Sequence, residues 1–346
     1  MSLSRIVKAM LGFFCLISTC HGSPLKSDES VFFFPTSANQ DKNLKWNIPI
    51  HHWVFEKEED GIGNIFTQKV FSEIAETLEV TEEQAHSELF RKRLGWFLVD
   101  NERNKKIEIC LENKQKEQLE LTSANGHATT AFTFETKAQD STWLSYKVLK
   151  DDRLFEGKVQ LIPKTGLTVI SDIDDTIKVS EVLDKKTLIK NTFLEPFKAT
   201  AGMPEYYKKL QEQGAYFHYV SASPWQLYPS LELFMEENYP AGTVSLRNFR
   251  LKDSSILKFL KSSENYKTAQ IRNIIQRYPK HQFILIGDSG EHDPEVYAAI
   301  YEQFPTAIKS IQIRAVTNSD LSDQRFNATF KEVPKRIWKL FSEPNK

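Results

Sequence analysis

A short apolar segment, residues 167–170, runs directly into a group of acidic residues. The segment is too short for a helix and rich in β-branched residues, which predicts a buried strand of a parallel sheet. Asp172, Asp174 and Thr176 follow at once. Ligands of open α/β sheets bind beyond the carboxyl ends of strands, so one carboxylate there could attack a substrate while the other transfers a proton. Asp and Thr also cap helices, and this segment alone leaves that structural role open.

The chain beyond residue 166 alternates predicted strands with predicted helices. The strands are 167–170, 215–220, 283–286 and 310–316, and the helices are 204–213, 224–237, 268–278 and 294–303. This alternation predicts right-handed β-α-β crossovers and a mostly parallel sheet with helices on both faces.

The chain before residue 164 has short segments of period two instead. Predicted strands are 32–34, 46–50, 52–55, 96–99, 106–111, 128–134, 144–148 and 155–161, with a turn at 60–63 and a hairpin that joins 96–99 to 106–111. Helical spacing over 66–78 and a capping box from Thr81 to Gln84 predict two helices, the second ending at Leu94. We therefore expect a β-rich, sandwich-like domain over 23–164 and an α/β domain over 165–346.

Residues 1–22 have the layout of a secretory signal peptide. Arg5 and Lys8 precede an apolar run over residues 10–17, and small or polar residues follow it. The run is too short to span a bilayer, which favours cleavage over a membrane anchor and predicts a secreted or periplasmic protein. Lipid modification of Cys20 is a further alternative.

The composition excludes a strong basic field. Lys and Arg number 45 against 46 Asp and Glu, so no nucleic acid partner is predicted. Without Arg5 and Lys8 of the leader the formal charge moves from −1 to −3, since −1 − 2 = −3. The sequence leaves the oligomeric state open.

Histidine and cysteine residues do not form a recognisable site in the sequence. His51, His52, His86 and His127 lack carboxylates or cysteines at a metal-binding interval, so core or surface positions are predicted for them. Cys110 is the one cysteine outside the leader, which predicts a partly buried structural thiol and no internal disulfide.

Two further strand ends carry polar residues. Ser221 follows the strand 215–220 and could donate to a phosphate oxygen, although capping a helix that starts at Pro224 is the alternative. Asp288 follows the strand 283–286. Carboxylates gathered at neighbouring strand ends would repel one another without a cation, and their oxygens suit Mg²⁺.

Lys267 begins the predicted helix 268–278 and could supply positive charge to a transferring phosphoryl group. Reaching into solvent is the alternative for a helix lysine, and Lys258 and Lys261 are competing candidates.

Four stretches together resemble a known family. They are Ser-Asp-Ile-Asp-Asp-Thr-Ile-Lys at 171–178, Gly-Met-Pro at 202–204, Tyr-Val-Ser-Ala-Ser-Pro-Trp-Gln-Leu-Tyr at 219–228 and Gly-Asp-Ser-Gly-Glu-His-Asp-Pro-Glu at 287–295. The pattern is similar to the Mg²⁺-dependent phosphatidate phosphatases of actin-patch-protein type, within the haloacid dehalogenase superfamily. The likeness is dense from about residue 165 to 317 and weaker in the N-terminal domain. It implies a Rossmann-like parallel sheet of haloacid dehalogenase type.

The resemblance also implies roles for individual residues. Asp172 would be the nucleophile that forms an aspartyl-phosphate, and Asp174 would protonate the leaving group and then activate water. Ser221 would bind the phosphoryl oxygens and Lys267 would neutralise them. The residues implied to contact the substrate are Thr176 and Ser223, and those implied at Mg²⁺ are Asp172, Asp174 through its carbonyl, Asp288 and Asp293.

The spacing of these motifs predicts an open cleft. About 25 residues separate Thr176 from Pro204, and about 30 separate the helix at Trp225 from Lys267, which is too few for a large lid domain. An open cleft favours a phosphate carried on a lipid in a membrane over a small enclosed metabolite. The predicted activity is therefore conversion of phosphatidate to diacylglycerol, with phospholipid at a membrane surface as the partner.

The sequence is also compatible with other substrates and with a non-catalytic role. The same chemistry could act on a phosphoprotein, a lysolipid or a sugar phosphate, or the chain could be a non-catalytic lipid- or protein-binding module. The basic, amphipathic segment 335–341 could rest on a membrane or dock onto its own sheet.

Overall fold

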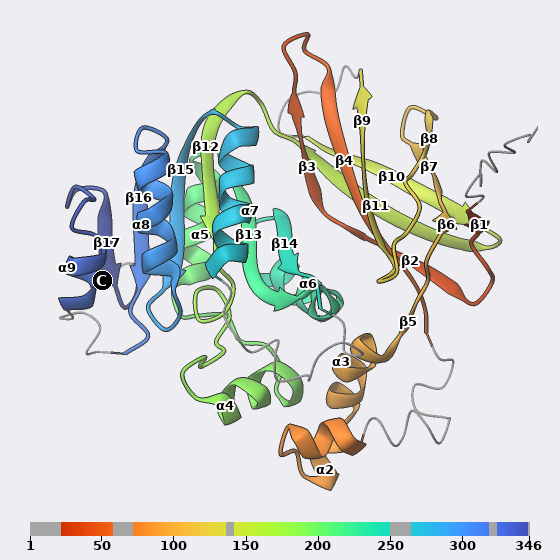
Figure 1. The fold of residues 1–346 in the computed structure, drawn as a ribbon, viewed down its shortest axis with the longest axis horizontal. Coiled ribbons are helices and arrows are strands. Elements are labelled where there is room, and N and C mark those ends of the chain that lie inside the picture. The colour runs from red at the N-terminus through yellow and green to blue at the C-terminus, as the bar shows by residue number, and fades with distance from the viewer. Residues whose placement is uncertain (1–21, 58–71, 136–141, 250–263, 318–323, 345–346) are drawn as a thin grey trace, which may run out of the picture.

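The computed structural model describes residues 22–57, 72–135, 142–249, 264–317 and 324–344. Within these ranges the chain forms two regions, each built around its own main sheet (Figure 1). The predicted mixed α/β class with a β-rich region is thereby confirmed. No helix in these ranges is long and apolar enough to cross a membrane.

Six parallel strands make up the C-terminal sheet, in the order β14-β13-β12-β15-β16-β17. Their bounds are Thr165–Ser171 for β12, Ala215–Pro224 for β13, Thr243–Arg247 for β14, Lys280–Asp288 for β15, Ile308–Arg314 for β16 and Trp338–Phe341 for β17. The four predicted strands are present. Strand β14 was not predicted from its five residues. Because β12 pairs with both β13 and β15, the carboxyl ends of these three strands lie side by side.

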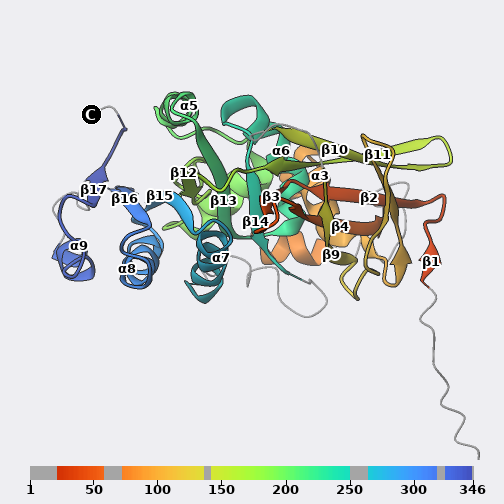
Figure 2. The ribbon, with the colours of Figure 1, turned by 90° about the horizontal axis from the view of Figure 1, so that it is seen from above.

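Helices cover both faces of this sheet, as predicted. α5 (Met203–Glu212) and α6 (Tyr228–Asn238) contribute to one hydrophobic core, and α7 (Glu264–Arg277) and α8 (Asp293–Gln303) contribute to another. Figure 2 shows α5 on one side of the sheet, with α7, α8 and α9 (Gln324–Thr329) on the other. The shorter helices are α4 (Lys185–Ile189), η1 (Lys190–Leu194) and η2 (Trp225–Leu227).

The basic segment near the C-terminus docks onto its own sheet. It enters as strand β17 beside β16, rather than as a helix. Trp338 is 6% exposed and stacks on Phe330, with ring centroids 4.7 Å apart. The apolar side chains of this segment therefore complete the core instead of facing outward.

The N-terminal region is a nine-stranded sheet in which β3 joins two groups of strands. The path is β2-β4-β3-β11-β10-β7-β8, and β5 and β9 also pair with β4. The bounds are Glu29–Phe34 for β2, Thr36–Gln40 for β3, Trp46–Glu56 for β4, Asp100–Asn101 for β5, Glu108–Leu111 for β7, Lys116–Gln118 for β8, His127–Phe134 for β9, Trp143–Lys150 for β10 and Arg153–Leu161 for β11; β1 (Ser23–Pro24) pairs with β6 (Lys105–Lys106) separately. One core contains side chains from both groups, among them Ile48 and Val159. Cys110 is half-buried on β7, as predicted.

One prediction in this region is wrong. Residues 96–98 end helix α3 (Glu88–Leu98) and do not form a strand, so the predicted hairpin is absent. The Ser87 side chain accepts from the Phe90 amide and starts the helix, and Phe90, Leu94 and Phe97 at helical spacing bury one face. The capping box at Thr81 and Gln84 is present but starts only the short helix α2 (Glu82–Ala85).

The remaining N-terminal predictions fall partly within the described residues. Residues 72–77 are helical, in agreement with the prediction for 66–78. The start of that helix, the turn at 60–63 and residues 1–21 of the leader lie outside the described residues. The two strands predicted at 46–50 and 52–55 form the single strand β4.

The two regions pack directly against each other. One hydrophobic core contains Phe34 and Phe90 from the N-terminal region together with Phe193 and Tyr228 from the C-terminal region. A polar contact elsewhere also joins the two regions, because Tyr278 Oη donates to Ser37 Oγ at 2.7 Å. The strand-rich region thus lies beside the part of the α/β region that carries the candidate site.

Candidate active site

The carboxyl ends of β12, β13 and β15 bring the predicted polar residues together. Asp172 directly follows β12, and Asp288 is the last residue of β15. Lys267 reaches them from α7, and its Nζ lies 2.8 Å from Asp172 Oδ1. Residues separated by more than 100 positions in the sequence therefore share one site.

Three aspartates form a compact, buried group. Asp172, Asp288 and Asp293 each offer a carboxylate oxygen, and these atoms lie within 4.8 Å of one another. All three side chains are at most 1% exposed. Burial raises the pKa of Asp172 well above its usual range, and Asp293, Glu291 and Asp288 raise it further against the opposing charge of Lys267. Burial and the nearby carboxylates raise the pKa of Asp288 in the same way.

Lys267 provides positive charge within this group. Its Nζ lies 2.7 Å from Asp293 Oδ1 and 2.9 Å from Glu291 Oε2, in addition to the contact with Asp172. Burial alone would lower the pKa of Lys267, but the three carboxylates raise it well above its usual value. The side chain is 2% exposed, so the alternative that this lysine extends into solvent is wrong. Lys258 and Lys261 lie outside the described residues.

Asp288 has one carboxylate oxygen without a protein partner. Its Oδ1 accepts from the amides of Gly290 at 2.6 Å and Glu291 at 3.2 Å. Its Oδ2 is buried and has no hydrogen-bond partner among the residues that the structure describes. A buried, unpaired carboxylate oxygen is costly, so this atom is well suited to a cation.

The carboxylate of Asp174 points to a different set of partners. Its Oδ1 contacts Lys178 Nζ and Ser180 Oγ, at 2.8 and 2.7 Å. Burial alone would raise the pKa of Asp174, but Lys178 and the hydroxyls of Ser180 and Ser223 outweigh it and hold the pKa well below its usual range. Asp174 is therefore ionised here, and its side chain is not a member of the three-aspartate group.

The two predicted serines contact Asp174. Ser221 Oγ and Ser223 Oγ both donate to Asp174 Oδ2, at 3.1 and 2.8 Å. Because β13 continues to Pro224 and α6 begins only at Tyr228, Ser221 does not cap that helix, and this alternative is wrong.

Thr176 contacts the predicted nucleophile from below the surface. Its Oγ1 donates to Asp172 Oδ2 at 3.4 Å, and its side chain is fully buried. Thr176 therefore lies beside Asp172 and is not exposed to solvent.

Several residues at the site carry no individual prediction. Glu291 belongs to the recognised stretch 287–295, and its amide and carboxylate both contact the site. Asp175 adopts a left-handed conformation with φ of 52° and accepts from the amides of residues 180–182, which fixes the loop after β12. Both residues lie inside the stretches that resemble the family, and this position was the sequence feature that could have identified them.

The fold and the site together define a mixed α/β protein with a buried carboxylate group and a lysine at the strand ends. Residues 167–315 match the family model described as phosphatidate phosphatase APP1, catalytic domain. By this match residues 167–315 belong to that family of catalytic domains. Phosphatidate phosphatase APP1 of Saccharomyces cerevisiae is 32% identical over 245 residues, which cover 67% of this chain and 41% of that protein.

A second relative is an uncharacterized protein of Schizosaccharomyces pombe. It is 30% identical over 175 residues, which cover 49% of this chain and 28% of that protein. The chain thus spans less than half of the length of each of these two relatives. Among solved structures, a ferredoxin–NADP⁺ reductase from Plasmodium falciparum with 2′P-AMP aligns at 10% identity over 84% of this chain and 95% of its own, with a TM-score of 0.19, too low to bear on fold or function.

Proposed function

We propose that this protein is a Mg²⁺-dependent phosphatase that hydrolyses phosphatidate to diacylglycerol at a membrane surface. One observation carries the proposal: Asp172 and Asp288 lie together at adjacent strand ends and Lys267 reaches them from α7. All three lie inside the segment that matches a phosphatidate phosphatase catalytic domain, as does Ser221, which contacts Asp174. We extend the proposal to the fold, as a parallel sheet of haloacid dehalogenase type preceded by a sandwich-like domain.

The charges of the site fit Mg²⁺. The ammonium group of Lys267 lies near four carboxylates, those of Asp172, Asp288, Asp293 and Glu291. When these are ionised, negative charge is in excess among the described residues of the site. The unpaired Asp288 Oδ2 adds an oxygen ligand of the kind that Mg²⁺ prefers. When bound, Mg²⁺ would supply positive charge to the phosphoryl oxygens.

Asp172 is the residue that we assign as nucleophile. Among the described residues its Oδ2 has one long contact, from Thr176, whereas its Oδ1 forms an ion pair with Lys267. A bond forms between a carboxylate oxygen and phosphorus while the bond from phosphorus to the lipid oxygen breaks, and that oxygen takes up a proton. Water then cleaves the acyl phosphate, which restores Asp172 and releases inorganic phosphate.

Asp174 is assigned to proton transfer. As a carboxylate it can accept the proton of the attacking water in the second step. Donating a proton in the first step requires it to lose at least the Lys178 contact, because that ion pair stabilises the ionised form. Ser221 and Ser223, which contact Asp174 before substrate binds, are placed to donate to phosphoryl oxygens instead when substrate is present.

The leader over residues 1–22 remains a prediction, and we propose on its basis that the protein acts outside the cytoplasm, as a secreted or periplasmic enzyme. Mass spectrometry of the mature N-terminus tests this part. An intact residue 1 in protein recovered from its native compartment would contradict it.

Phosphate release from phosphatidate in mixed micelles tests the activity. We expect release that requires Mg²⁺, that stops with a chelator, and that falls roughly a thousandfold or more in Asp172→Asn, since removal of a nucleophile has effects of this order. Asp152→Asn, at an exposed turn of the N-terminal region, is the matched control and should leave release unchanged.

The substrate class is tested by comparing phosphatidate with lysophosphatidate, a phosphopeptide and a sugar phosphate. Faster release from a soluble phosphomonoester than from phosphatidate would replace the lipid assignment while keeping the chemistry. Equal release by the wild type and Asp172→Asn would remove the enzymatic assignment altogether.

A further inference from the structure

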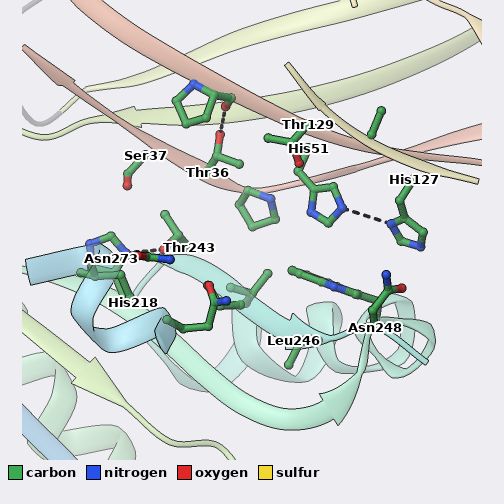
Figure 3. A pocket seen from close by; sticks show the side chains of 18 of the residues that line it. Thr36, Ser37, His51, His127, Thr129, His218, Thr243, Leu246, Asn248 and Asn273 are labelled. Carbon is green, nitrogen blue, oxygen red and sulfur yellow. Dashed lines mark hydrogen bonds between the residues drawn. The ribbon is translucent and has the colours of Figure 1, made fainter. Parts of the chain in front are cut away.

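A cavity of about 480 Å³ lies between the two regions of the chain, away from the carboxylate group. Figure 3 shows strands of the N-terminal region on one side, with Thr36, His51, His127 and Thr129, and the C-terminal region on the other, with His218, Thr243 and Asn273. Its volume falls within the range of small-molecule sites. Neither the family match nor the proposed reaction assigns it a role.

The wall of this cavity is mixed in polarity and carries almost no formal charge. Hydroxyl, amide and imidazole side chains line it together with apolar ones such as Trp225 and Leu246, and among the described lining residues Arg277 alone has a permanent charge. No Asp, Glu or Lys of the described ranges takes part in the lining. Such a surface disfavours cationic ligands and suits a molecule with hydroxyl groups and one negative charge.

The positive end of the cavity is formed by Arg277 and its neighbours. Arg277 lies at the end of α7, where its Nη1 donates to the carbonyl of Ser37 at 3.4 Å and its guanidinium also hydrogen-bonds the side chain of Tyr278. His218 lines the same cavity, is 2% exposed, and its Nε2 has no hydrogen-bond partner within the described part of the chain. Arg277 forms no ion pair with a carboxylate of the described ranges, and its guanidinium fork matches the geometry of a phosphate or carboxylate group.

The other end of the cavity offers neutral hydrogen-bonding groups. His51 Nε2 lies 3.1 Å from His127 Nδ1, and Asn125 Nδ2 donates to Asn248 Oδ1 at 2.8 Å across the two regions. Burial, and to a lesser extent neighbouring histidines, keep the pKa values of both imidazoles well below the usual value. These rings are thus uncharged at neutral pH. Because one nitrogen of each ring is used in the contact between them, the pair together offers a ligand one donor and one acceptor, as a polyol requires.

We propose that this interdomain cavity, lined by residues of β3, β4, β9, β14 and α7, binds a small hydroxylated oxyanion whose phosphate or carboxylate group pairs with Arg277. The hydroxyl groups of the ligand lie toward His51, His127 and Asn125. The oxyanion is either a free small molecule or the headgroup of a lipid. The site is separate from the carboxylate group, since no member of that group lines the cavity.

Isothermal titration of the full chain without Mg²⁺ tests the site. The probes are gluconate, a carboxylate, and glycerophosphoinositol, a phosphodiester that a monoester phosphatase does not hydrolyse; myo-inositol is the uncharged comparison. We expect at least one anionic probe to bind at one site, and Arg277→Gln to weaken it roughly tenfold to a hundredfold, because a charged hydrogen-bonding partner is lost.

Two control variants locate the binding. Arg272→Gln lies on the same helix but contacts Gln303, and should bind the probe as the wild type does. Ser221→Ala alters the candidate active site and should also bind normally. The proposal is overturned if neither anionic probe binds, if myo-inositol binds as tightly as the anions, or if Ser221→Ala weakens binding while Arg277→Gln does not.

A vesicle experiment separates the two sources of the anion. The protein is cosedimented with phosphatidylcholine vesicles, with and without phosphatidylinositol. Binding that requires phosphatidylinositol and is lost in Arg277→Gln would assign the cavity to a lipid headgroup. Binding of the soluble probe with no such dependence in vesicles would assign it to a free small molecule.

Discussion

The ring of Phe34 packs on the ring of Trp225, with centroids 4.4 Å apart, and joins the two regions of the chain beside the candidate active site. His51 contacts the same indole, with centroids 4.6 Å apart. Trp225 lies two residues after Ser223, whose hydroxyl donates to Asp174. The N-terminal region therefore supports the segment that carries the two site serines.

Replacement of Phe34 should consequently affect catalysis from a distance. We expect Phe34→Leu to lower kcat/KM for phosphatidate by roughly tenfold to a hundredfold, because small displacements of positioning groups have effects of this size. Phosphate release at several substrate concentrations measures it. Phe33→Leu is the control, since Phe33 lies on the same strand but packs on Tyr146 in the other core. Equal losses of kcat/KM in the two variants would contradict a specific role for the Trp225 contact.

Lys267 should hold the carboxylate group together in the absence of a metal ion. We expect Lys267→Met to lower the free energy of unfolding by about 3–5 kcal/mol, because three buried or half-buried carboxylates lose their partner. Added Mg²⁺ should restore part of this loss, since the aspartates would then attract the cation more strongly. Urea denaturation with and without Mg²⁺ measures both effects.

Lys178→Met is the comparison for this experiment. Lys178 pairs with Asp174, outside the three-aspartate group, so its loss should destabilise the protein without increasing the effect of Mg²⁺. If Mg²⁺ stabilises Lys267→Met no more than it stabilises the wild type, the three aspartates do not form a cation site.

The sequence predicts that these carboxylates lie together because backbone topology brings them to one edge of the sheet. Asp172 and Asp288 each end a strand with a short apolar pattern, and parallel strands bring such ends to one edge. The orientation of Asp174 was not predictable in this way. Its carboxylate turns to Lys178 and Ser180, which depends on the loop fixed by Asp175 rather than on any spacing.

Elements that depend on tertiary contacts were predicted less well. Residues 96–99 are apolar and aromatic, which favours a strand locally. Helix α3 forms instead because it buries Phe90 and Phe97 against Phe193 of the other region. The contact of His51 with His127 joins positions 76 residues apart, and no sequence interval marks it. The cavity beside these histidines could not be predicted either, because its lining residues are also far apart in the sequence.

His52 should make the protein sensitive to acid. Its ring is fully buried, neither nitrogen has a hydrogen-bond partner among the described residues, and burial lowers its pKa from 6.5 to about 4. The unfolded chain therefore binds a proton more readily than the folded chain between these values, and stability falls as the pH falls through this window. The difference of about 2.5 pKa units corresponds to roughly 3 kcal/mol when the window has been crossed.

His52→Phe should remove this contribution. We expect the free energy of unfolding to depend less steeply on pH between 6.5 and about 4 in the variant, by up to one proton, as measured by urea denaturation at a series of pH values. His86→Phe serves as the control, because His86 is at the end of α2 and is not buried. Identical pH profiles for His52→Phe and the wild type would show that the buried imidazole does not titrate with unfolding.

Arg93 should anchor residues 185–197, the insert that contains α4 and η1 and follows the loop after β12. Its Nη1 donates to the carbonyls of Thr192 at 2.8 Å and Glu195 at 2.7 Å, and its guanidinium lies 3.6 Å from the centre of the Phe197 ring. Lysine lacks the planar guanidinium that stacks flat on the ring. We therefore expect Arg93→Lys to destabilise the protein by about 1–3 kcal/mol and to speed amide hydrogen exchange over residues 190–197.

The same change should reach the site through the insert. Asn191 Nδ2 donates to the carbonyl of Ser180, whose hydroxyl contacts Asp174, so loosening the insert loosens a partner of that carboxylate. Arg91→Lys, exposed on the same helix and in contact with His86, is the control and should leave both exchange and phosphate release unchanged. Equal exchange rates over residues 190–197 in the two variants would mean that Arg93 does not hold the insert, and that other contacts of η1 with α3, such as Phe90 with Phe193, are sufficient.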